Sequence, residues 1–393
     1  MKKPFVISIS GVSGGGKTTV TNELKDCLLN SAVVSFDDYD DIKLDRDIND
    51  WSADGNDENE WYVEPLAQDI ERLLSEPLDY IIVDYPFGYR NLRVGKHINF
   101  AVFIDTPLDV ALARRMIRDY TNRAADRNKI KVNLSAIEKE LLFYLDRSRP
   151  TYVRMPETQK PSSDFIADGM KIPYEIADDI INALSVRNHY DAIIDEIDDP
   201  LERKVVDPAH DPEPLKAYMN KWDGDPFREV MLLTPDKSVL EIGVGTGRLA
   251  LRVCCKCGNF TGIDISPKTV ERAKQNLQDF PNVRLICNDY LMHRFDETFD
   301  VIYSSLTFMH IKDKRAAIQK TADLLNSGGR FVLSISKDHQ TEIDYGTRKV
   351  TVYPDVPEEI TLLLMEAGLV MEKQFETEFA VIFAAVKELN DES

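Results

Sequence analysis

A glycine-rich loop near the start of the sequence has the residue types that bind nucleotide phosphates. Residues 11–18 read GVSGGGKT and satisfy the spacing G-x-x-x-x-G-K-[ST]. Such glycines let backbone N–H groups face a phosphate chain, while the lysine reaches the terminal phosphates and the threonine hydroxyl binds Mg²⁺. ATP or another nucleoside triphosphate is therefore expected to contact Gly11, Ser13, Gly14, Gly15, Gly16, Lys17, Thr18 and Thr19. The alternative is a glycine-rich turn with a solvent-exposed lysine.

Carboxylates follow two apolar runs in the same half of the chain. Asp37 and Asp38 come after the run 32–36, and Asp84 ends the run that starts at Tyr80. Doubly wound sheets gather their active sites at the C-terminal ends of the strands. There Asp37 could take the proton of an acceptor hydroxyl, and Asp84 could support Mg²⁺ through bound water. The alternative in each case is an ordinary carboxylate that ends a strand.

Three arginines lie close together in the segment 109–120, which has helical spacing. Arg114, Arg115 and Arg118 fall within about one helical turn of one another. A helix that closes over transferring phosphates needs such cations. We expect Arg114 and Arg118 to act with Lys17, although a solvated basic face is the alternative interpretation.

The order of these segments resembles the uridine kinase and phosphoribulokinase-like group of P-loop kinases. The loop GVSGGGKTT, the strand end VSFDDYD, the segment YIIVDYPFGY and the helix FIDTPLDVALARRMIRDY occur in that group's order, over about residues 3–187. The resemblance implies phosphoryl transfer from ATP to a small hydroxyl compound, with Asp37 as base and the arginine helix in a lid. Residues 48–61, INDWSADGNDENEW, depart from the uridine kinase pattern, so the resemblance does not identify the acceptor.

A second strand followed by alternate glycines occurs in the other half of the chain. Residues 239–247 read VLEIGVGTG, and Arg248 stands where the dinucleotide fingerprint G-x-G-x-x-G requires its third glycine. Seventeen residues after Gly247, the strand FTGI ends in Asp264, which is well placed to accept hydrogen bonds from two ribose hydroxyls. The alternative role, capping the following helix, suits Ser266 better.

This second pattern resembles the E-x-G-x-G-x-G loop of class I S-adenosylmethionine methyltransferases. The segments FDVIYSS and NSGGRFVLS complete the likeness, which covers about residues 214–388. The resemblance implies that S-adenosylmethionine is bound by Glu241, Gly243, Gly245, Gly247, Asp264, Ile265, Asn288 and Asp289. It places Asn288 and Asp289 at the adenine ring, where an ordinary turn is the alternative. His310 falls near the acceptor side, but we interpret it as a histidine at the edge of the core.

Apolar runs of strand length recur through the chain and alternate with amphipathic segments. They are 5–10, 32–36, 80–84, 101–104, 165–167, 238–242, 260–263, 283–286, 301–304 and 330–335. This rhythm predicts an α/β fold with two doubly wound domains, a P-loop NTPase-type parallel sheet followed by a Rossmann-like methyltransferase sheet. We expect a P-loop kinase-like domain over residues 1–190, an acidic proline-containing linker over 191–213, and a methyltransferase domain over 214–393. The helix 174–184 is expected to close the first domain.

Composition limits the partners of such a protein. The formal net charge of −20 disfavours long nucleic acids, although small nucleotides can still bind through local N–H groups and a few cations. We find no run near the roughly 18 apolar residues that span a bilayer, and we expect residues 1–10 to form a strand rather than a signal peptide. The five cysteines include a C-x-x-C pair, Cys254 and Cys257, which we interpret as reduced thiols rather than a zinc site. We therefore expect a soluble cytoplasmic protein.

The leading hypothesis is a bifunctional enzyme that phosphorylates a small nucleoside-like or sugar-like hydroxyl compound with ATP and Mg²⁺ and methylates a small molecule. A second hypothesis is a methyltransferase whose P-loop half is a nucleotide-binding regulatory module. A third is a non-enzymatic protein whose two sites report metabolite levels. Small-molecule substrates are the expected partners, without nucleic acid or membrane, and the oligomeric state is not predicted.

Overall fold

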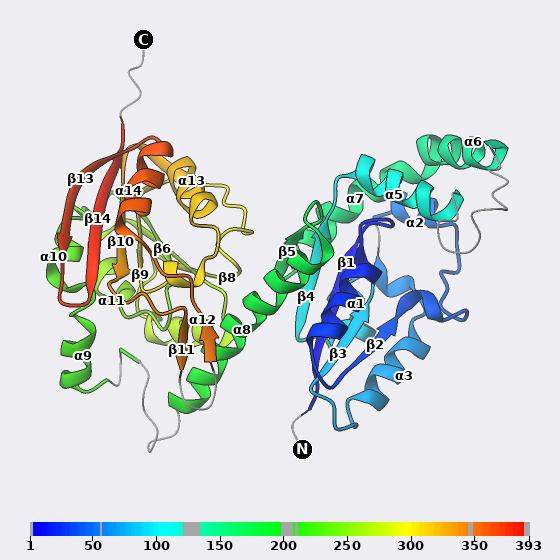
Figure 1. Cartoon of the computed structure of the whole chain (residues 1–393), viewed down its shortest axis with the longest axis horizontal. Coiled ribbons are helices and arrows are strands. Elements are labelled where there is room, and N and C mark those ends of the chain that lie inside the picture. Colours follow the sequence, from blue (N-terminus) through cyan, green and yellow to red (C-terminus); the bar gives the residue numbers. More distant parts are fainter. Residues whose placement is uncertain are drawn as a thin grey trace, which may run out of the picture. The chain divides into compact units, whose positions relative to one another are not determined.

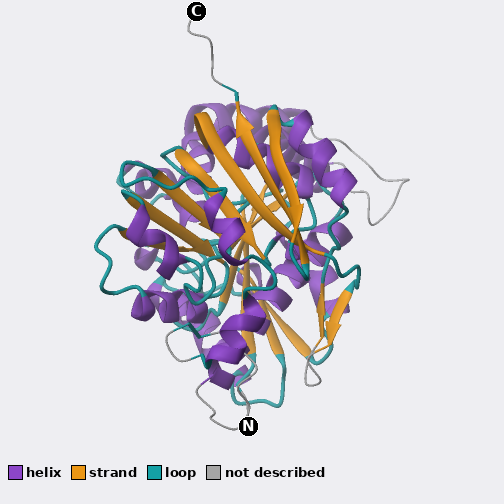
Figure 2. Ribbon diagram, turned by 90° about the vertical axis from the view of Figure 1, so that its left-hand side faces the viewer, coloured by secondary structure: helices purple, strands orange, loops and turns teal. Residues whose placement is uncertain are grey.

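The computed structural model of this chain describes residues 3–55, 57–120, 134–197, 207–208, 211–344 and 349–388. Their contacts divide the chain into two units, Met1–Ala183 and Leu184–Ser393, which we call the N-terminal unit and the C-terminal unit. Each unit is built around its own β-sheet with helices beside it (Figures 1 and 2). The predicted α/β class, with one sheet for each half of the chain, is therefore confirmed.

The sheet of the N-terminal unit is parallel throughout and has the strand order β2-β3-β1-β4-β5. The strands are β1 (Phe5–Gly11), β2 (Ser31–Ser35), β3 (Tyr80–Asp84), β4 (Phe100–Asp105) and β5 (Phe165–Asp168). The helices are α1 (Lys17–Cys27), α2 (Ile48–Ala53), α3 (Glu64–Leu73), α4 (Leu92–Gly95), α5 (Leu108–Tyr120), α6 (Leu134–Phe143), α7 (Arg149–Gln159) and α8 (Pro173–Ile197), of which α8 continues into the C-terminal unit.

Burial explains why these segments form strands and helices. The central strands β1 and β4 read as nearly continuous apolar runs because helices cover both faces of a parallel sheet. In α3 the buried residues Leu66, Ala67, Ile70 and Leu73 recur at helical spacing and pack in the core beside β2. The register pairs Ile9 of β1 with the last residue of β3, so the C-terminal ends of these strands lie together.

The C-terminal unit has a mixed sheet with the order β13-β14-β10-β9-β6-β7-β8. Its strands are β6 (Ser238–Ile242), β7 (Asn259–Asp264), β8 (Val283–Cys287), β9 (Phe299–Ser305), β10 (Leu325–Ser336), β13 (Leu369–Glu376) and β14 (Ala380–Lys387), with a separate pair β11 (Glu342–Asp344) and β12 (Lys349–Thr351). Its helices are α9 (Glu213–Met219), α10 (Gly224–Glu229), α11 (Ala250–Val253), α12 (Pro267–Asn276), α13 (Lys314–Leu324) and α14 (Pro357–Glu366). The strands β13 and β14 were not predicted, and β14 pairs antiparallel with both of its neighbours.

Helix α8 is longer than the sequence pattern indicated. The predicted end at Leu184 is wrong, since the helix continues to Ile197 and enters the segment that we predicted as a linker. Ile193 and Ile194 are buried, and Tyr190 packs beside them. The acidic composition of this stretch concealed an apolar stripe, and the division between the two units falls inside the helix. Of the described helices, none is long and apolar enough to cross a membrane.

Candidate active sites

The two residues predicted to support Mg²⁺ contact each other directly. Thr18 lies in the first turn of α1 and Asp84 ends β3, and the Thr18 Oγ1 donates a hydrogen bond of 2.6 Å to the Asp84 Oδ2. Burial raises the pKa of the Asp84 carboxyl, while the Thr18 hydrogen bond and the charge of Lys17 oppose that rise. A hydroxyl and a carboxylate are the hard oxygen donors that Mg²⁺ requires, so these residues fit the ion.

Lys17 lies among the other groups expected to take part in phosphoryl transfer. Burial lowers the pKa of its ammonium group, and the negative charges of Asp84 and Asp37 counteract this effect. The nearby guanidinium of Arg118 adds to the lowering. Asp37 itself is exposed in the short 3₁₀ turn that follows β2. Two cations and two carboxylates thus gather where β2 and β3 end.

The glycine-rich loop is fixed against its neighbours on one side and open on the other. Gly14 has φ +81°, and a Cβ there would lie 2.2 Å from the carbonyl oxygen of Ala111 in α5. The Gly15 carbonyl accepts a hydrogen bond of 2.8 Å from the Thr106 hydroxyl. Gly16 has φ +102°, and nothing lies within 4 Å of a Cβ placed on it. The loop therefore has a rigid back and an open face on which phosphates could lie.

The remaining predicted loop residues lie along the same path. Gly11 ends β1, where a Cβ would approach the carbonyl oxygen of Ile104 to 3.0 Å. Ser13 is half-buried in the loop, and Thr19 is exposed in the first turn of α1. Their positions agree with contact to a bound nucleotide, which stays a prediction for each of them.

The arginines of α5 point to different partners. Arg114 Nη1 donates to the carbonyl of Gly169 at 3.1 Å, which places its guanidinium at the turn after β5. Arg115 is buried and donates to the Tyr152 hydroxyl at 2.5 Å and to Glu140 at 2.9 Å. Arg115 therefore joins α5 to α6 and α7.

Arg118 is an arginine of this helix whose charge interacts with those of Lys17 and Asp37. Its guanidinium forms an ion pair with Asp119 at 2.6 Å, and this hydrogen bond together with the charge of Asp37 raises the pKa of Arg118. Of the two arginines expected to be catalytic, Arg118 lies with Lys17 and Asp37, whereas Arg114 is engaged at Gly169.

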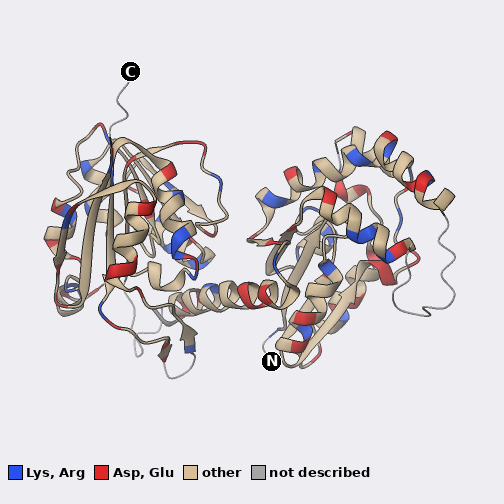
Figure 3. Cartoon of the chain, turned by 45° about the horizontal axis from the view of Figure 1, so that its top comes forward, with Lys and Arg blue, Asp and Glu red and all other residues tan. Residues whose placement is uncertain are grey.

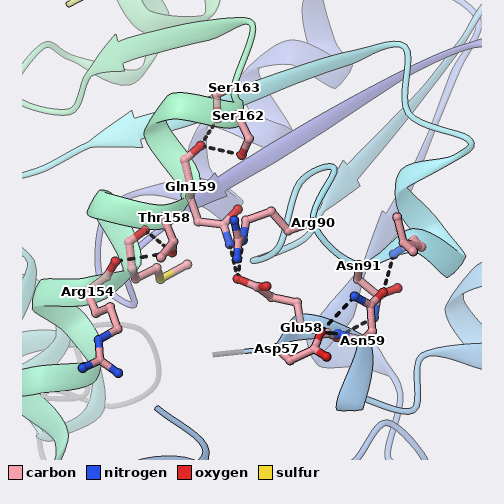
Figure 4. A network of polar contacts seen from close by, with 12 residues as sticks. Asp57, Glu58, Asn59, Arg90, Asn91, Arg154, Thr158, Gln159, Ser162 and Ser163 are labelled. Atoms are coloured by element: carbon pink, nitrogen blue, oxygen red, sulfur yellow. Dashed lines mark hydrogen bonds and ion pairs between the residues drawn. The ribbon is translucent and has the colours of Figure 1, made fainter. Parts of the chain in front are cut away.

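A buried carboxylate, that of Glu58, organises a network of polar contacts in the N-terminal unit (Figure 4). The side chain of Glu58 is 3% exposed and accepts hydrogen bonds from Arg90 Nε at 2.7 Å and Gln159 Nε2 at 3.1 Å. The Asn91 side chain donates to the backbone carbonyl of Glu58 at 2.7 Å. This network connects the unusual segment 48–61 to α7 and to the loop after β3.

Aromatic rings pack around Phe36, the residue that precedes Asp37. Phe36, the residue before Asp37, makes edge or tilted contacts with Trp61, Tyr85 and Phe87 at centroid distances of 5.7 to 5.9 Å. The Tyr85 ring is fully buried, and its hydroxyl has no hydrogen-bond partner among the described residues. A cluster of aromatic rings and a polar network thus lie in the same unit as Asp37.

The glycine loop of the C-terminal unit is held by the predicted ribose carboxylate. Asp264 Oδ2 accepts from the Gly245 N–H at 2.9 Å, and its Oδ1 accepts from the Ser266 N–H at 3.0 Å. Burial raises the pKa of this carboxyl, and the backbone N–H groups oppose the rise. Gly245 has φ +55° with nothing within 4 Å of a Cβ, whereas a Cβ on Gly243 would lie 1.9 Å from the Thr307 hydroxyl. An open loop beside a carboxylate fits S-adenosylmethionine.

The other residues predicted to contact the cofactor form different hydrogen bonds within the protein. Glu241 is buried within β6 and accepts a hydrogen bond of 2.8 Å from the Tyr303 hydroxyl of β9, and burial raises its pKa well above the ordinary value. Asn288 donates its backbone N–H to the Asp264 carbonyl at 2.9 Å, which holds the end of β8 beside β7. Asp289 accepts from the Met292 N–H at 3.1 Å and so caps the next turn.

Ile265 follows Asp264 directly, and its carbonyl lies 3.9 Å from the Cys287 sulfur.

The cysteines are all free thiols. Desolvation is the chief cause that raises the pKa of the buried Cys254 thiol to about 12 and that of the buried Cys257 thiol to about 11. Across the described residues, no group of three or more His, Cys, Asp or Glu could hold a metal ion.

Comparisons with known proteins match each unit to a different family. A model described as the Phosphoribulokinase / Uridine kinase family matches residues 64–154, and one described as Methyltransferase domain matches residues 240–333. The N-terminal unit resembles uridine kinases. The C-terminal unit resembles S-adenosylmethionine-dependent methyltransferases.

Individual relatives agree with this division. A uridine kinase of Borrelia duttonii is 28% identical over 184 residues, which are 41% of this chain and 84% of that kinase. The malonyl-[acyl-carrier protein] O-methyltransferase 1 of Ilyobacter polytropus is 33% identical over 99 residues, or 25% of this chain. The corresponding enzyme of Anoxybacillus flavithermus is 33% identical over 109 residues, or 27% of this chain. The chain spans only 37% and 42% of the lengths of these two methyltransferases.

Solved structures are also similar to part of this chain. The N-methyltransferase NodS from Bradyrhizobium japonicum, solved with S-adenosyl-L-homocysteine, is 19% identical with a TM-score of 0.39, covering 51% of this chain and 98% of NodS. The [4+2]-cyclase SpnF is 16% identical with a TM-score of 0.43, covering 53% of this chain and 98% of SpnF.

Two groups of polar residues were missed by the sequence analysis. In the N-terminal unit, Glu58, Arg90 and Gln159 lie outside any motif. The only indication in the sequence was that residues 48–61, which include Glu58, depart from the uridine kinase pattern. In the C-terminal unit, Asp191 contacts Ser266, two residues after Asp264, and Tyr190 contacts His310 after β9, yet both precede the matched residues 240–333. The acidic composition around Asp191 had suggested a linker.

Proposed function

We propose that this chain is a bifunctional enzyme that phosphorylates a small nucleoside-like or sugar-like alcohol and methylates a small molecule. The kinase part of the proposal rests on the contact between Thr18 and Asp84, with Lys17 beside them. ATP with Mg²⁺ is the proposed phosphoryl donor, because the loop, the hydroxyl and the carboxylate suit a metal-bound triphosphate.

In the proposed phosphoryl transfer, the acceptor hydroxyl attacks the terminal phosphorus of ATP as the bond to the leaving ADP oxygen breaks. Asp37, exposed at the end of β2, takes the proton of that hydroxyl. Lys17 and Arg118 balance the negative charge that accumulates on the phosphoryl oxygens. The cluster of aromatic rings and the Glu58 network would position the rest of the acceptor.

The methyltransferase part of the proposal rests on Asp264, which ties the open glycine loop to the end of β7. S-adenosylmethionine supplies an activated methyl group when it is bound. The protein's contribution is to hold the cofactor and to align the acceptor, because methyl transfer from a sulfonium needs little covalent help. Asp264 would hold the ribose, with the backbone of residues 243–247 beneath the cofactor.

We also propose a cytoplasmic location. The five free cysteines suit a reducing compartment.

The test uses the intact chain and a Lys17→Ala variant, incubated with a metabolite extract, ATP, Mg²⁺ and methyl-labelled S-adenosylmethionine. We expect a metabolite that gains a phosphate only with intact Lys17, and a methyl-labelled product with both proteins. Mass spectrometry identifies both acceptors. An Asp37→Asn variant should bind ATP but lose phosphoryl transfer.

If no alcohol is phosphorylated while methylation proceeds unchanged in Lys17→Ala, the kinase proposal is wrong. The P-loop half would then be a nucleotide-binding module. If no methyl label is transferred by either protein, the methyltransferase proposal fails instead.

A further inference from the structure

The last turns of α8 contact the loop that carries the predicted ribose carboxylate. Asp191 Oδ1 accepts hydrogen bonds from the Ser266 hydroxyl at 2.7 Å and from the Lys268 N–H at 3.2 Å. The backbone N–H of Ser266 in turn donates to Asp264 Oδ1 at 3.0 Å. Ser266 therefore links the carboxylate of Asp191 in α8 to the carboxylate of Asp264 at the end of β7.

A second contact ties the same part of α8 to the loop after β9. The Tyr190 hydroxyl lies 2.8 Å from His310 Nε2, and burial lowers the pKa of this histidine to about 3, so the ring is neutral. Thr307, three residues earlier, lies directly against Gly243 of the glycine loop. The helix is thus fixed to both loops that flank the proposed cofactor site.

Asp191 and Asp264 are two carboxylates in one neighbourhood, and their charges repel. The charge of Asp191 adds to the rise in the Asp264 pKa that burial causes. Both oxygens of Asp264 already accept a backbone N–H, whereas Asp191 Oδ2 has no hydrogen-bond partner among the described residues. A ligand that donates several hydrogen bonds would weaken the repulsion between the two carboxylates, since each carboxylate oxygen can accept two hydrogen bonds.

We propose that Asp191 is a second carboxylate of the cofactor site, whose Oδ2 accepts a hydrogen bond from one ribose hydroxyl of S-adenosylmethionine while Asp264 accepts from the other. This inference rests on the proposed methyltransferase function. It assigns the final turns of α8 to the cofactor site, although they lie outside the matched residues 240–333.

A purely structural role for Asp191 is the competing explanation. The start of α12 is already capped without Asp191, because Ser266 Oγ accepts from the Thr269 N–H at 3.1 Å. Asp195, one helical turn further along α8, pairs with the ammonium of Lys268 at 2.6 Å and is 66% exposed. Both aspartates thus contact the beginning of α12, but Asp191 alone of the two is an electrostatic neighbour of Asp264. Asp195→Asn is therefore a matched control for Asp191→Asn.

The experiment measures ligand binding to the full-length chain by isothermal titration calorimetry, with S-adenosylhomocysteine and its 2′-deoxy and 3′-deoxy analogues as probes. We expect Asp191→Asn to weaken S-adenosylhomocysteine binding by about tenfold or more, the effect of losing a charge-assisted hydrogen bond. Asp195→Asn should change it less than about twofold, as expected for an exposed ion pair. The wild type should prefer S-adenosylhomocysteine over both analogues.

The deoxy analogues separate a direct contact from an indirect one. If Asp191 accepts a ribose hydroxyl, Asp191→Asn will lose discrimination against one analogue and keep it against the other. Equal weakening for all three ligands, or unchanged binding of S-adenosylhomocysteine, would overturn the inference. If the wild type binds none of them, the proposed methyltransferase function itself has failed. Should Asp191→Asn not fold, Asp191→Glu, which displaces the carboxylate by one methylene, is judged by the same criteria.

Discussion

Asp84 and Glu241 are both buried carboxylates, but their surroundings differ. Asp84 lies beside the ammonium of Lys17 and accepts from Thr18, and this polar environment suits a metal ligand. Glu241 accepts from the Tyr303 hydroxyl within the sheet, and desolvation raises its pKa despite that bond and the charge of Arg248. A carboxylate in such a position ties two strands together and also makes the stability of the unit depend on pH.

The sign of that dependence follows from proton binding. Because the folded state holds the Glu241 proton more tightly than the unfolded state, stability falls as pH rises from the ordinary value of 4.5 to the raised pKa of the folded state. We expect wild-type protein without cofactor to lose more stability between pH 5 and pH 8 than Glu241→Gln does. Urea unfolding at each pH, with amide hydrogen exchange in β6 and β9 as the readout, measures this difference in stability. Glu229→Gln, the same change at an exposed residue, should behave like the wild type, and an identical pH slope in Glu241→Gln would contradict the prediction.

Among the elements, α5 constrains the shape of the glycine-rich loop, residues 11–18. Gly14 lies so close to Ala111 that any side chain at that position would push the loop and the helix apart. Gly55 offers a comparison, since it has φ +115° but nothing lies within 4 Å of a Cβ there. The two glycines thus separate the cost of backbone conformation from the cost of a steric clash.

We expect Gly14→Ala to destabilise the N-terminal unit by about 3 kcal/mol, from overpacking and a left-handed backbone together. Gly55→Ala should cost about 1 kcal/mol, from the backbone alone. Thermal unfolding of both variants tests this, with titration of a fluorescent ATP analogue to show that only Gly14→Ala impairs nucleotide binding. Equal losses of stability would mean that the loop and α5 can move apart freely.

Sequence reasoning succeeded where contacts follow from a motif and failed where they depend on how elements are oriented. The contact between Thr18 and Asp84 was predictable because the ends of parallel strands converge on the loop. The different directions of Arg114 and Arg118 were not, since helical spacing relates the two residues to each other but not to the sheet. Asp191 was missed because its partner Ser266 lies 75 residues away.

At the scale of the whole molecule, acidic and basic residues are interspersed along the same helices in both units (Figure 3). With a net charge of −20, this agrees with a preference for small nucleotides over long polyanions, which stays a prediction. The boundary between the units stays a proposal as well, and α8 sharpens it, because its residues from Leu184 onward belong with the C-terminal unit.

Fragments of the chain test where the C-terminal unit begins. We expect a fragment of residues 184–393 to unfold at a higher temperature than one of residues 200–393. Burial of Ile193 and Ile194 alone is worth about 3 kcal/mol or more, and the hydrogen bonds of Tyr190 and Asp191 add to it. Differential scanning calorimetry compares the two, with residues 1–183 as the complementary fragment. Equal unfolding temperatures would show that α8 contributes nothing to this unit.

The hydrogen bonds of Asp264 have a consequence for the rate of the proposed methyl transfer. Its carboxylate joins the glycine loop to the start of α12 through two backbone hydrogen bonds, and a site held in this way would need little rearrangement to bind a ligand. When association needs no rearrangement, differences in affinity arise mainly in the dissociation rate. A site whose affinity came from slow dissociation would also retain the demethylated product of the cofactor. If the proposed methyltransferase function holds, the residence time of S-adenosylhomocysteine would set an upper limit on the number of methyl groups that one molecule can transfer each second.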